Sequence, residues 1–114
     1  MANLILLENL LFAVTDVFGK KVRLTKSYWL KIKTEKHREL TFDYKEVIKT
    51  LEKPDEVYLS VSDDYIRLFF KKYRDSTLVV LVKYLNGDGF VVTVYQTSKV
   101  KRKGVKIWPY QKYF

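Results

Sequence analysis

The feature of this sequence that most constrains its fold is a change of hydrophobic period at Pro54. After it, apolar residues recur at every second position, which is the period of β-strands. The predicted strands are 57–61, 65–73, 78–85 and 90–97. The separators between them are Asp63-Asp64, Asp75-Ser76 and Asn86-Gly87-Asp88-Gly89, which have the composition of tight turns. Because a parallel connection needs about a dozen residues or more, these strands are predicted to be antiparallel.

Two helices are predicted before the strands. Thr25 stands at the N-cap of the first helix, whose C-terminal end lies near His37. The apolar residues of that helix fall at helical spacing and are Tyr28, Trp29 and Ile32. Asp43 and Glu46 have the spacing of a capping box at the start of the second helix. The predicted apolar face of the second helix is Tyr44, Val47, Ile48 and Leu51, and Pro54 ends it.

The residues before the helices predict a hairpin within 1–24, with a glycine-containing turn at 16–20. The predicted fold class is therefore α+β, with an N-terminal hairpin and two helices packed on a four-stranded antiparallel β-meander. A length of 114 residues and the lack of an internal repeat or linker indicate a single domain, 1–114. The basic and aromatic tail, 98–114, is expected either to dock as a last strand or to bind a partner.

Composition excludes several classes of protein. Hydrophobic residues make up 47% of the chain, which is typical of a folded domain rather than a disordered one. The absence of cysteine excludes disulfides, thiolate nucleophiles and cysteine-ligated metals. The apolar run 4–14 lacks a basic flank and a cleavage site, and it is shorter than the roughly 20 residues that span a bilayer. We therefore expect a cytoplasmic protein without a membrane partner.

The formal net charge of +9 favours encounter with polyanions. The tail from 98 onward contains no acidic residue. Its cations are Lys99, Lys101, Arg102, Lys103, Lys106 and Lys112. Lysine and arginine that neutralise phosphates give a salt-sensitive affinity without sequence specificity, although a charge run of this kind is also typical of a purely solvating tail.

Alternation along the predicted strands sorts their side chains onto two faces. The apolar face, which the helices are expected to cover, has Ile66, Leu68, Phe70, Leu78, Val80, Val82, Val92 and Val94. The other face is predicted to have Tyr65, Arg67, Phe69, Lys71, Lys83, Thr93, Tyr95 and Thr97. Cations, hydroxyls and aromatic rings together suit phosphates and unstacked bases. A solvated sheet face of ordinary composition is the alternative.

Candidates for catalysis are few. The sequence has no glycine-rich phosphate loop and no nucleophile elbow, and its one histidine, His37, cannot form a two-histidine zinc motif. Asp63 and Asp64 are more typical of a turn than of a metal site, so we predict no metal and no cofactor. An imidazole exchanges protons near neutral pH, which makes His37 a candidate acid or base. The simpler interpretation of His37 is that it caps the C-terminus of the first helix.

Several segments resemble a known family. They are 14–25, Trp29, 35–40, 51–57 and the Thr93-x-Tyr95-x-Thr97 pattern within 90–97. Together they resemble the phage and mobile-element branch of the barnase, EndoU, colicin and RelE-like (BECR) nuclease superfamily. This resemblance implies a metal-independent ribonuclease or a toxin of RelE-like fold. The site residues that it implies are His37, Arg67, Thr93, Tyr95 and Thr97.

The leading hypothesis is an endoribonuclease that leaves a 2′,3′-cyclic phosphate. In this hypothesis His37 acts as acid or base and Arg67 neutralises the transition-state phosphate. The hydroxyls of Thr93, Tyr95 and Thr97 orient that phosphate. The residues expected to hold RNA are Lys71, Lys83, Lys99, Lys101, Arg102 and Lys103. Toxin activity also implies an antitoxin or immunity protein. The alternatives are a non-catalytic nucleic-acid-binding module and an interaction domain of a mobile-element protein.

Overall fold

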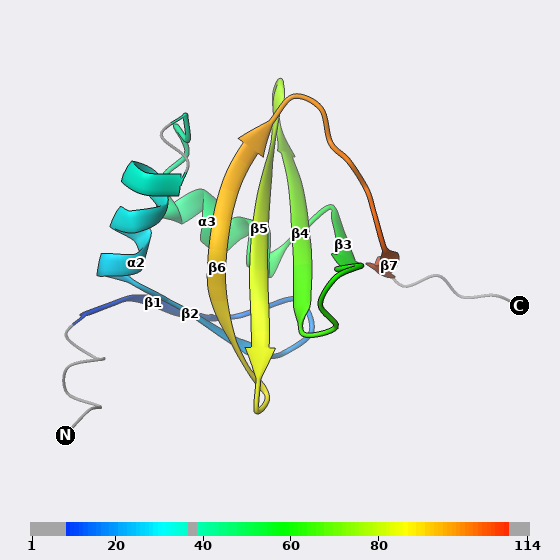
Figure 1. Ribbon diagram of the computed structural model, residues 1–114, viewed down its shortest axis with the longest axis horizontal. Coiled ribbons are helices and arrows are strands. Elements are labelled where there is room, and N and C mark those ends of the chain that lie inside the picture. The colour runs from blue at the N-terminus through cyan, green and yellow to red at the C-terminus, as the bar shows by residue number, and fades with distance from the viewer. Residues whose placement is uncertain (1–8, 37–38, 110–114) are drawn as a thin grey trace, which may run out of the picture.

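One mixed sheet organises the residues that the structure describes, which are 9–36 and 39–109 (Figure 1). In this computed structural model, seven strands of the described residues lie in the order β1-β2-β6-β5-β4-β3-β7. The strands are β1 (Leu10–Thr15), β2 (Lys21–Thr25), β3 (Glu56–Leu59), β4 (Ile66–Tyr73), β5 (Ser76–Leu85), β6 (Asp88–Thr97) and β7 (Val105–Trp108).

The predicted fold class is wrong, because the four predicted strands, β3 to β6, are only the middle of this larger sheet. The N-terminal hairpin forms from β1 and β2, but β2 also pairs in parallel with β6. At the other edge, β7 from the predicted tail pairs with β3. Local sequence patterns identify strands but do not identify pairings between strands far apart in the chain. Both outer parts of the sheet depend on such distant pairings.

Tight turns set the register of β4, β5 and β6. Tyr73 pairs with Ser76, and Leu85 pairs with Asp88, so each connection has two residues. The second connection is Asn86-Gly87, with φ values of 55° at the asparagine and 87° at the glycine. Type I′ hairpin turns require these positive values, and this is the reason for the asparagine–glycine pair.

The register gives β4 the opposite orientation from its prediction. Phe69 pairs with Val80 and Arg67 pairs with Val82. Directly paired residues of antiparallel strands point to the same face, so Arg67 and Phe69 lie on the face that the helices cover, here called the core face. The side chains predicted for the core face but found on the opposite face are Ile66, Leu68 and Phe70. The alternation of apolar and polar residues does not show which face of β4 points toward the helices, because the neighbouring strand β5 is apolar on both faces over 78–82.

A β-bulge in β6 changes which valines reach the core. The register of β6 against β5 shifts by one residue in mid-strand. Val91 is therefore buried in place of the predicted Val92, whereas Val94 is buried as predicted. The carbonyl oxygen of Val92 instead accepts hydrogen bonds from the Tyr28 hydroxyl at 2.8 Å and the Lys36 ammonium at 3.1 Å. At this point the edge of β6 bonds to helical residues rather than to another strand.

The first predicted helix forms with its predicted cap. The Thr25 hydroxyl accepts a hydrogen bond from the Tyr28 N–H at 3.2 Å, which confirms the N-cap of α2 (Lys26–Lys31). The helix continues as a short π-helix, η1 (Ile32–Lys36). Its predicted end near His37 lies outside the described residues.

The second predicted helix, α3 (Tyr44–Glu52), has the predicted capping box. The Asp43 side chain accepts from the helix N-terminus, and the Asp43 N–H donates to Glu46 Oε1 at 2.9 Å. Val47 and Leu51 point into the core and are fully buried. Of the described helices, none has the length and apolar character needed to cross a membrane.

The helices and the β1–β2 hairpin cover the core face of the central strands. Figure 1 shows α3 and the hairpin behind β4, β5 and β6, with α2 beside β6. The buried residues that they enclose with the sheet include Phe12, Val22, Leu24, Trp29, Ile32, Val47, Leu51, Phe69, Val80, Val82 and Val94. No described helix lies over the opposite face, which we call the open face.

The predicted tail contributes the last strand, which is the first of the two roles expected for it. β7 pairs antiparallel with β3 through Val105 and Lys106. Gly104, just before it, has a φ of 102°, and a Cβ there would collide with the Leu59 carbonyl oxygen. A glycine is therefore required for the chain to approach β3 this closely. The tail residues beyond 109 lie outside the described residues.

Candidate nucleic-acid interface

The predicted catalytic residues do not form one group in the structure. His37 lies outside the described residues, so the structure gives it no position. Arg67 lies on the core face of β4, whereas Thr93 and Tyr95 lie on the open face of β6. The sheet itself therefore separates the arginine from the residues that it was predicted to assist.

The surroundings of Arg67 explain its position. Its guanidinium carbon lies 4.6 Å from the ring centroid of Phe18 and 4.6 Å from that of Tyr84. A cation held between two aromatic faces is stabilised by both ring quadrupoles. In this position Arg67 bridges the β1–β2 turn and β5, which is a structural role.

Next to this arginine lies a buried carboxylate that was not among the predicted site residues. Asp16 is 5% exposed, and its Oδ1 accepts hydrogen bonds from the Phe18 and Lys20 N–H groups, both at 2.9 Å. Its Oδ2 accepts from the Tyr84 hydroxyl at 2.5 Å. The Asp16-Val17-Phe18-Gly19 sequence is the signal that could have identified it, because aspartate commonly bonds to backbone N–H groups in such turns.

Burial, and then the hydrogen bond to Asp16, raises the pKa of the Tyr84 phenol far above its ordinary value. Tyr84 therefore stays protonated and acts as a donor at neutral pH. With both carboxylate oxygens of Asp16 bonded, this cluster fixes the hairpin to the sheet.

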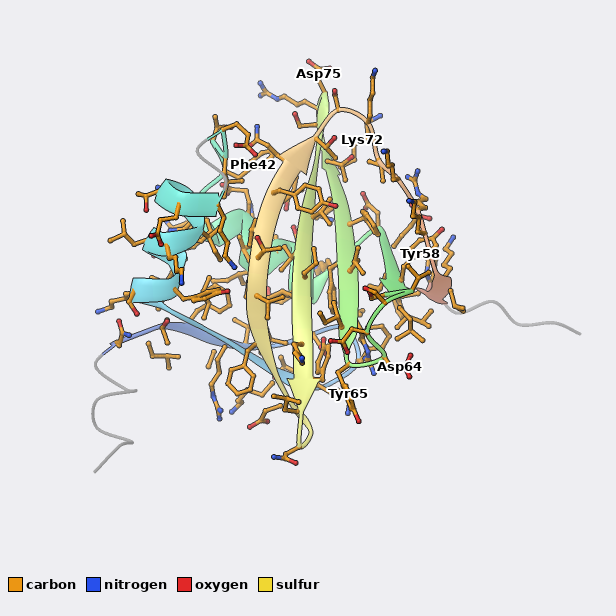
Figure 2. The ribbon with its side chains drawn as sticks, in the orientation of Figure 1. Phe42, Tyr58, Asp64, Tyr65, Lys72 and Asp75 are labelled. Atoms are coloured by element: carbon orange, nitrogen blue, oxygen red, sulfur yellow. The ribbon has the colours of Figure 1, made fainter. Side chains whose placement is uncertain are left out.

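The three predicted β6 hydroxyl residues do lie together, on the open face. Thr93, Tyr95 and Thr97 alternate along the strand, and their cross-strand neighbours on β5 are Leu81, Val79 and Thr77. Farther across the sheet, the open face also contains Tyr58, Ile66, Leu68, Phe70, Lys72 and Lys83. Figure 2 shows this side of the sheet, with Tyr58 and Lys72 labelled on it. Its centre is apolar and aromatic, but Phe70 and Val79 there are buried, at 2% and 0% exposure, and its lysines lie toward the ends of the strands.

The hydroxyls on β6 differ in what they contact. Thr93 Oγ1 is buried and has no hydrogen-bond partner among the described residues. Thr97 Oγ1 donates to the Lys99 carbonyl and accepts from the Lys99 N–H, both at 3.0 Å, so it closes the turn after β6. Burial raises the pKa of the Tyr95 phenol, which keeps that hydroxyl protonated.

The predicted pair of strand lysines is divided between the two faces. Lys71 lies on the core face at its rim, where its ammonium donates to the Lys53 carbonyl at 2.6 Å and lies 3.8 Å from Asp55 Oδ1. Lys83 lies on the open face, 3.3 Å from Asp63 Oδ2. Only the second of these lysines lies where a ligand of the open face would meet it.

The acidic turn beside Lys83 is occupied by protein contacts. Asp63 Oδ1 accepts the Tyr65 N–H at 2.8 Å, and this bond, more than the ion pair with Lys83, lowers the pKa of the Asp63 carboxyl. The part of the chain that the structure describes contains no cluster of three or more metal-ligating side chains.

The tail cations lie along the margin of the open face. We call Lys99, Lys101, Arg102, Lys103 and Lys106 the basic strap. In Figure 1 the strap arches from the end of β6 past the ends of β5 and β4 and then descends beside β4 to β7. Arg102 Nε lies 2.6 Å from Glu56 Oε1, and the Lys106 ammonium lies 3.4 Å from Glu56 Oε2. One carboxylate of β3 therefore holds two strap cations beside the open face.

The other strap cations are free to meet a ligand. Lys99, Lys101 and Lys103 are exposed and form no ion pair with another described residue. The arrangement brings together rings, hydroxyls and cations from segments far apart in the sequence. No protein-family model, curated protein or solved structure matches this chain, so its resemblance to the BECR nucleases stays a prediction.

Proposed function

We propose that this chain binds RNA through its open face and basic strap. The observation that supports this most directly is the pairing of β7 with β3, because it makes the strap run from the end of β6, which carries Thr93–Thr97, to the opposite edge of the sheet. Cations for phosphates, hydroxyls for the ribose 2′-hydroxyl and rings for bases then share one surface.

The charge distribution favours a polyanion at this surface. Glu56 neutralises part of the charge of Arg102 and Lys106, but Lys101 and Lys103 have no described acidic partner. The formal net charge of the whole chain is +9. Phosphates that replace the counterions of the strap would release those ions, so binding should weaken steeply as salt rises.

RNA cleavage is the narrower form of this proposal, and the structure changes what it requires. Arg67 is held between two rings on the core face, so transition-state charge would have to be neutralised by Lys83 or the strap. Binding requires no such rearrangement, and for this reason we propose binding first. An antitoxin or immunity partner stays a prediction.

The test measures binding of a fluorescein-labelled RNA by anisotropy in EDTA, between about 50 and 200 mM salt. Lys101→Glu combined with Lys103→Glu should weaken binding and reduce the salt slope by about 0.7 for each phosphate that the strap no longer neutralises. The matched control is Lys45→Glu combined with Lys49→Glu, which makes the same charge change at exposed positions of α3 on the other side of the sheet.

Equal losses in the two double variants would show that net charge alone attracts RNA and would reject the proposed surface. No binding of RNA, together with a salt-insensitive complex with another protein, would favour the interaction-domain alternative. Running the same samples on a denaturing gel shows whether the bound RNA is also cut.

A further inference from the structure

We infer that the end of the open face nearest the β5–β6 turn is a contact surface for a second copy of this chain. The residues of this surface, here called the end patch, are Ala13, Arg23, Leu85, Asp88 and Phe90. In Figure 1 the β5–β6 turn lies at the lower end of the sheet, whereas the strap leaves β6 at its upper end. The inference does not depend on the proposed RNA binding.

Phe90 is at the centre of a row of side chains that crosses four strands. It has Lys83 of β5 on one side and Arg23 of β2 on the other. Ala13 of β1 is the next residue along the row, because it pairs with Arg23. Laterally paired residues of neighbouring strands point to the same face of a sheet, so the row continues the open face onto the N-terminal hairpin.

The end patch is accessible, unlike the centre of the open face. Phe90 is 41% exposed, and Leu85, its diagonal neighbour on the open face, is 47% exposed. The side chains of Arg23 and Asp88 are 42% and 43% exposed. The Phe90 ring makes no contact with a ring or a cation of any other described residue. The end patch therefore offers an uncovered phenylalanine, which is a side chain enriched in protein interfaces.

The charges around Phe90 are self-complementary. Arg23 NH1 lies 3.3 Å from Asp88 Oδ2 within one chain. In a two-fold dimer each contact occurs twice with the residues exchanged, so Arg23 of one copy can meet Asp88 of the other on both sides of the axis. Each guanidinium then lies between two carboxylates, and the two Phe90 rings lie between the charged groups. The patch is therefore complementary to a copy of itself.

The balance of charge favours a second copy over RNA at the end patch. Arg23 is paired with Asp88, and the adjacent Lys83 is paired with Asp63, each at 3.3 Å. A phosphate placed there would meet the two carboxylates as well as the two cations. A second copy presents both signs of charge, so it matches this surface better than a polyanion does.

The basic strap does not prevent this contact. It leads to β7, which lies four strand spacings from β6, about 19 Å along the sheet. This separation exceeds the Debye length of about 8 Å at physiological ionic strength, so the strap charges are largely screened from the end patch. A dimer formed through the end patches would leave both straps accessible.

The first test is sedimentation of the whole chain without RNA, from about 10 to 500 μM, a range suited to a small interface. A monomer–dimer equilibrium is expected. Phe90→Ser should weaken dimerisation at least about tenfold, because it removes the ring at the centre of the contact. Val61→Ser is the matched control, since Val61 is 72% exposed and lies outside the end patch, and it should leave dimerisation unchanged. Thermal melts show that both variants are folded.

The second test exchanges charges between two variants. Arg23→Asp alone places carboxylates against carboxylates across the two-fold axis, and Asp88→Arg alone places guanidinium groups against each other, so each variant should be monomeric. In an equal mixture the new carboxylate meets the new guanidinium, and the remaining Asp88 meets the remaining Arg23. The mixture should therefore dimerise. Neither chain regains its own ion pair in the mixture, so a role of Arg23 and Asp88 within one chain cannot produce this rescue.

A chain that stays monomeric over the whole range, or a mixture that does not dimerise, would overturn the inference. A monomer whose affinity for the labelled RNA falls in Phe90→Ser would also overturn it and would assign the end patch to RNA. Dimerisation in a chain that binds no RNA would support the inference and reject the proposed function. The Lys101→Glu and Lys103→Glu double variant should dimerise as the unmodified chain does, because its changes lie in the strap.

Discussion

The Tyr84 hydroxyl donates a 2.5 Å hydrogen bond to Asp16 Oδ2, and this bond joins the turn of the N-terminal hairpin to β5. Both residues are buried, at 9% and 5% exposure. The bond therefore belongs to a network in which the hairpin turn, β4 and β5 meet.

Tyr84→Phe should destabilise the protein by about 1–3 kcal/mol, because it leaves a buried carboxylate oxygen without its donor. The loss is measured by urea unfolding. Tyr58→Phe is the control, since its 3.4 Å hydrogen bond is long and its removal should change stability by less than about 0.5 kcal/mol. Equal changes in the two variants would contradict the importance of the Asp16 bond.

Arg67→Leu should affect stability rather than RNA binding. Removing the guanidinium eliminates its interactions with Phe18 and Tyr84, and we expect the free energy of unfolding to fall by about 1–2 kcal/mol. Urea unfolding and the anisotropy assay are run on the same preparation. A variant of unchanged stability that binds or cuts RNA poorly would instead support the role predicted from the sequence, in which Arg67 neutralises the phosphate.

Gly104→Ala should detach the basic strap from the sheet, because the new Cβ would collide with the Leu59 carbonyl. We expect faster amide exchange at Val105 and Lys106 and weaker RNA binding. Gly87→Ala is the matched control, since Gly87 also has a positive φ but no atom within 4 Å of the added Cβ. A strap that stays protected in Gly104→Ala would contradict the need for glycine.

The Glu56 carboxylate should make attachment of the strap depend on pH. Burial acts to raise the pKa of Glu56, but the bonds to Arg102 and Lys106 outweigh it and hold that pKa below its ordinary value of 4.5. Since the folded pKa lies below the unfolded one, this stabilisation is complete above about pH 4.5 and is lost as pH falls through the folded pKa.

The protection of the β7 amides against exchange, measured relative to the rate of an unstructured peptide at the same pH, should therefore fall in acid in the unmodified chain. Glu56→Gln should show fast exchange at neutral pH already and a weaker pH dependence. The same acid response in both proteins would assign it to another carboxylate.

His37→Ala should abolish RNA cleavage, where cleavage is observed, and leave the affinity for the labelled RNA unchanged. The expected reason is loss of the group that exchanges protons near neutral pH. Denaturing gels report cleavage, and anisotropy reports binding. Cleavage at the original rate in His37→Ala would eliminate the acid–base hypothesis for this residue.

Local sequence signals predicted the local parts of the fold. The Asp43–Glu46 capping box, the Thr25 N-cap and the Asn86-Gly87 turn all form. Each depends on residues within a few positions of one another, so propensity and hydrogen-bonding chemistry determine them. The strands β3 to β6 follow from the period of their apolar residues.

The candidate site was harder to predict because it depends on register. In β5 both faces are apolar over 78–82, so alternation did not show whether Arg67 or Leu68 faces the helices. The Tyr73–Ser76 pairing across a two-residue turn decides it. In β6 the bulge changes which side chains point toward the core, and it places Val91 there. The contact of the tail with β3 is long-range and has no local signal.

The seam between β2 and β6 consists of two residue pairs, Val22–Gly89 and Arg23–Phe90. These pairs join segments that are far apart in the chain, so they can form only after much of the intervening sequence has been ordered. The ladders within β1–β2 and within β3–β6 have short connections, so they can form before the rest of the chain is ordered. We therefore expect this narrow seam to close last in folding, and the shared core and the Asp16–Tyr84 bond, rather than the two backbone pairs, to hold the hairpin to the sheet once it has closed.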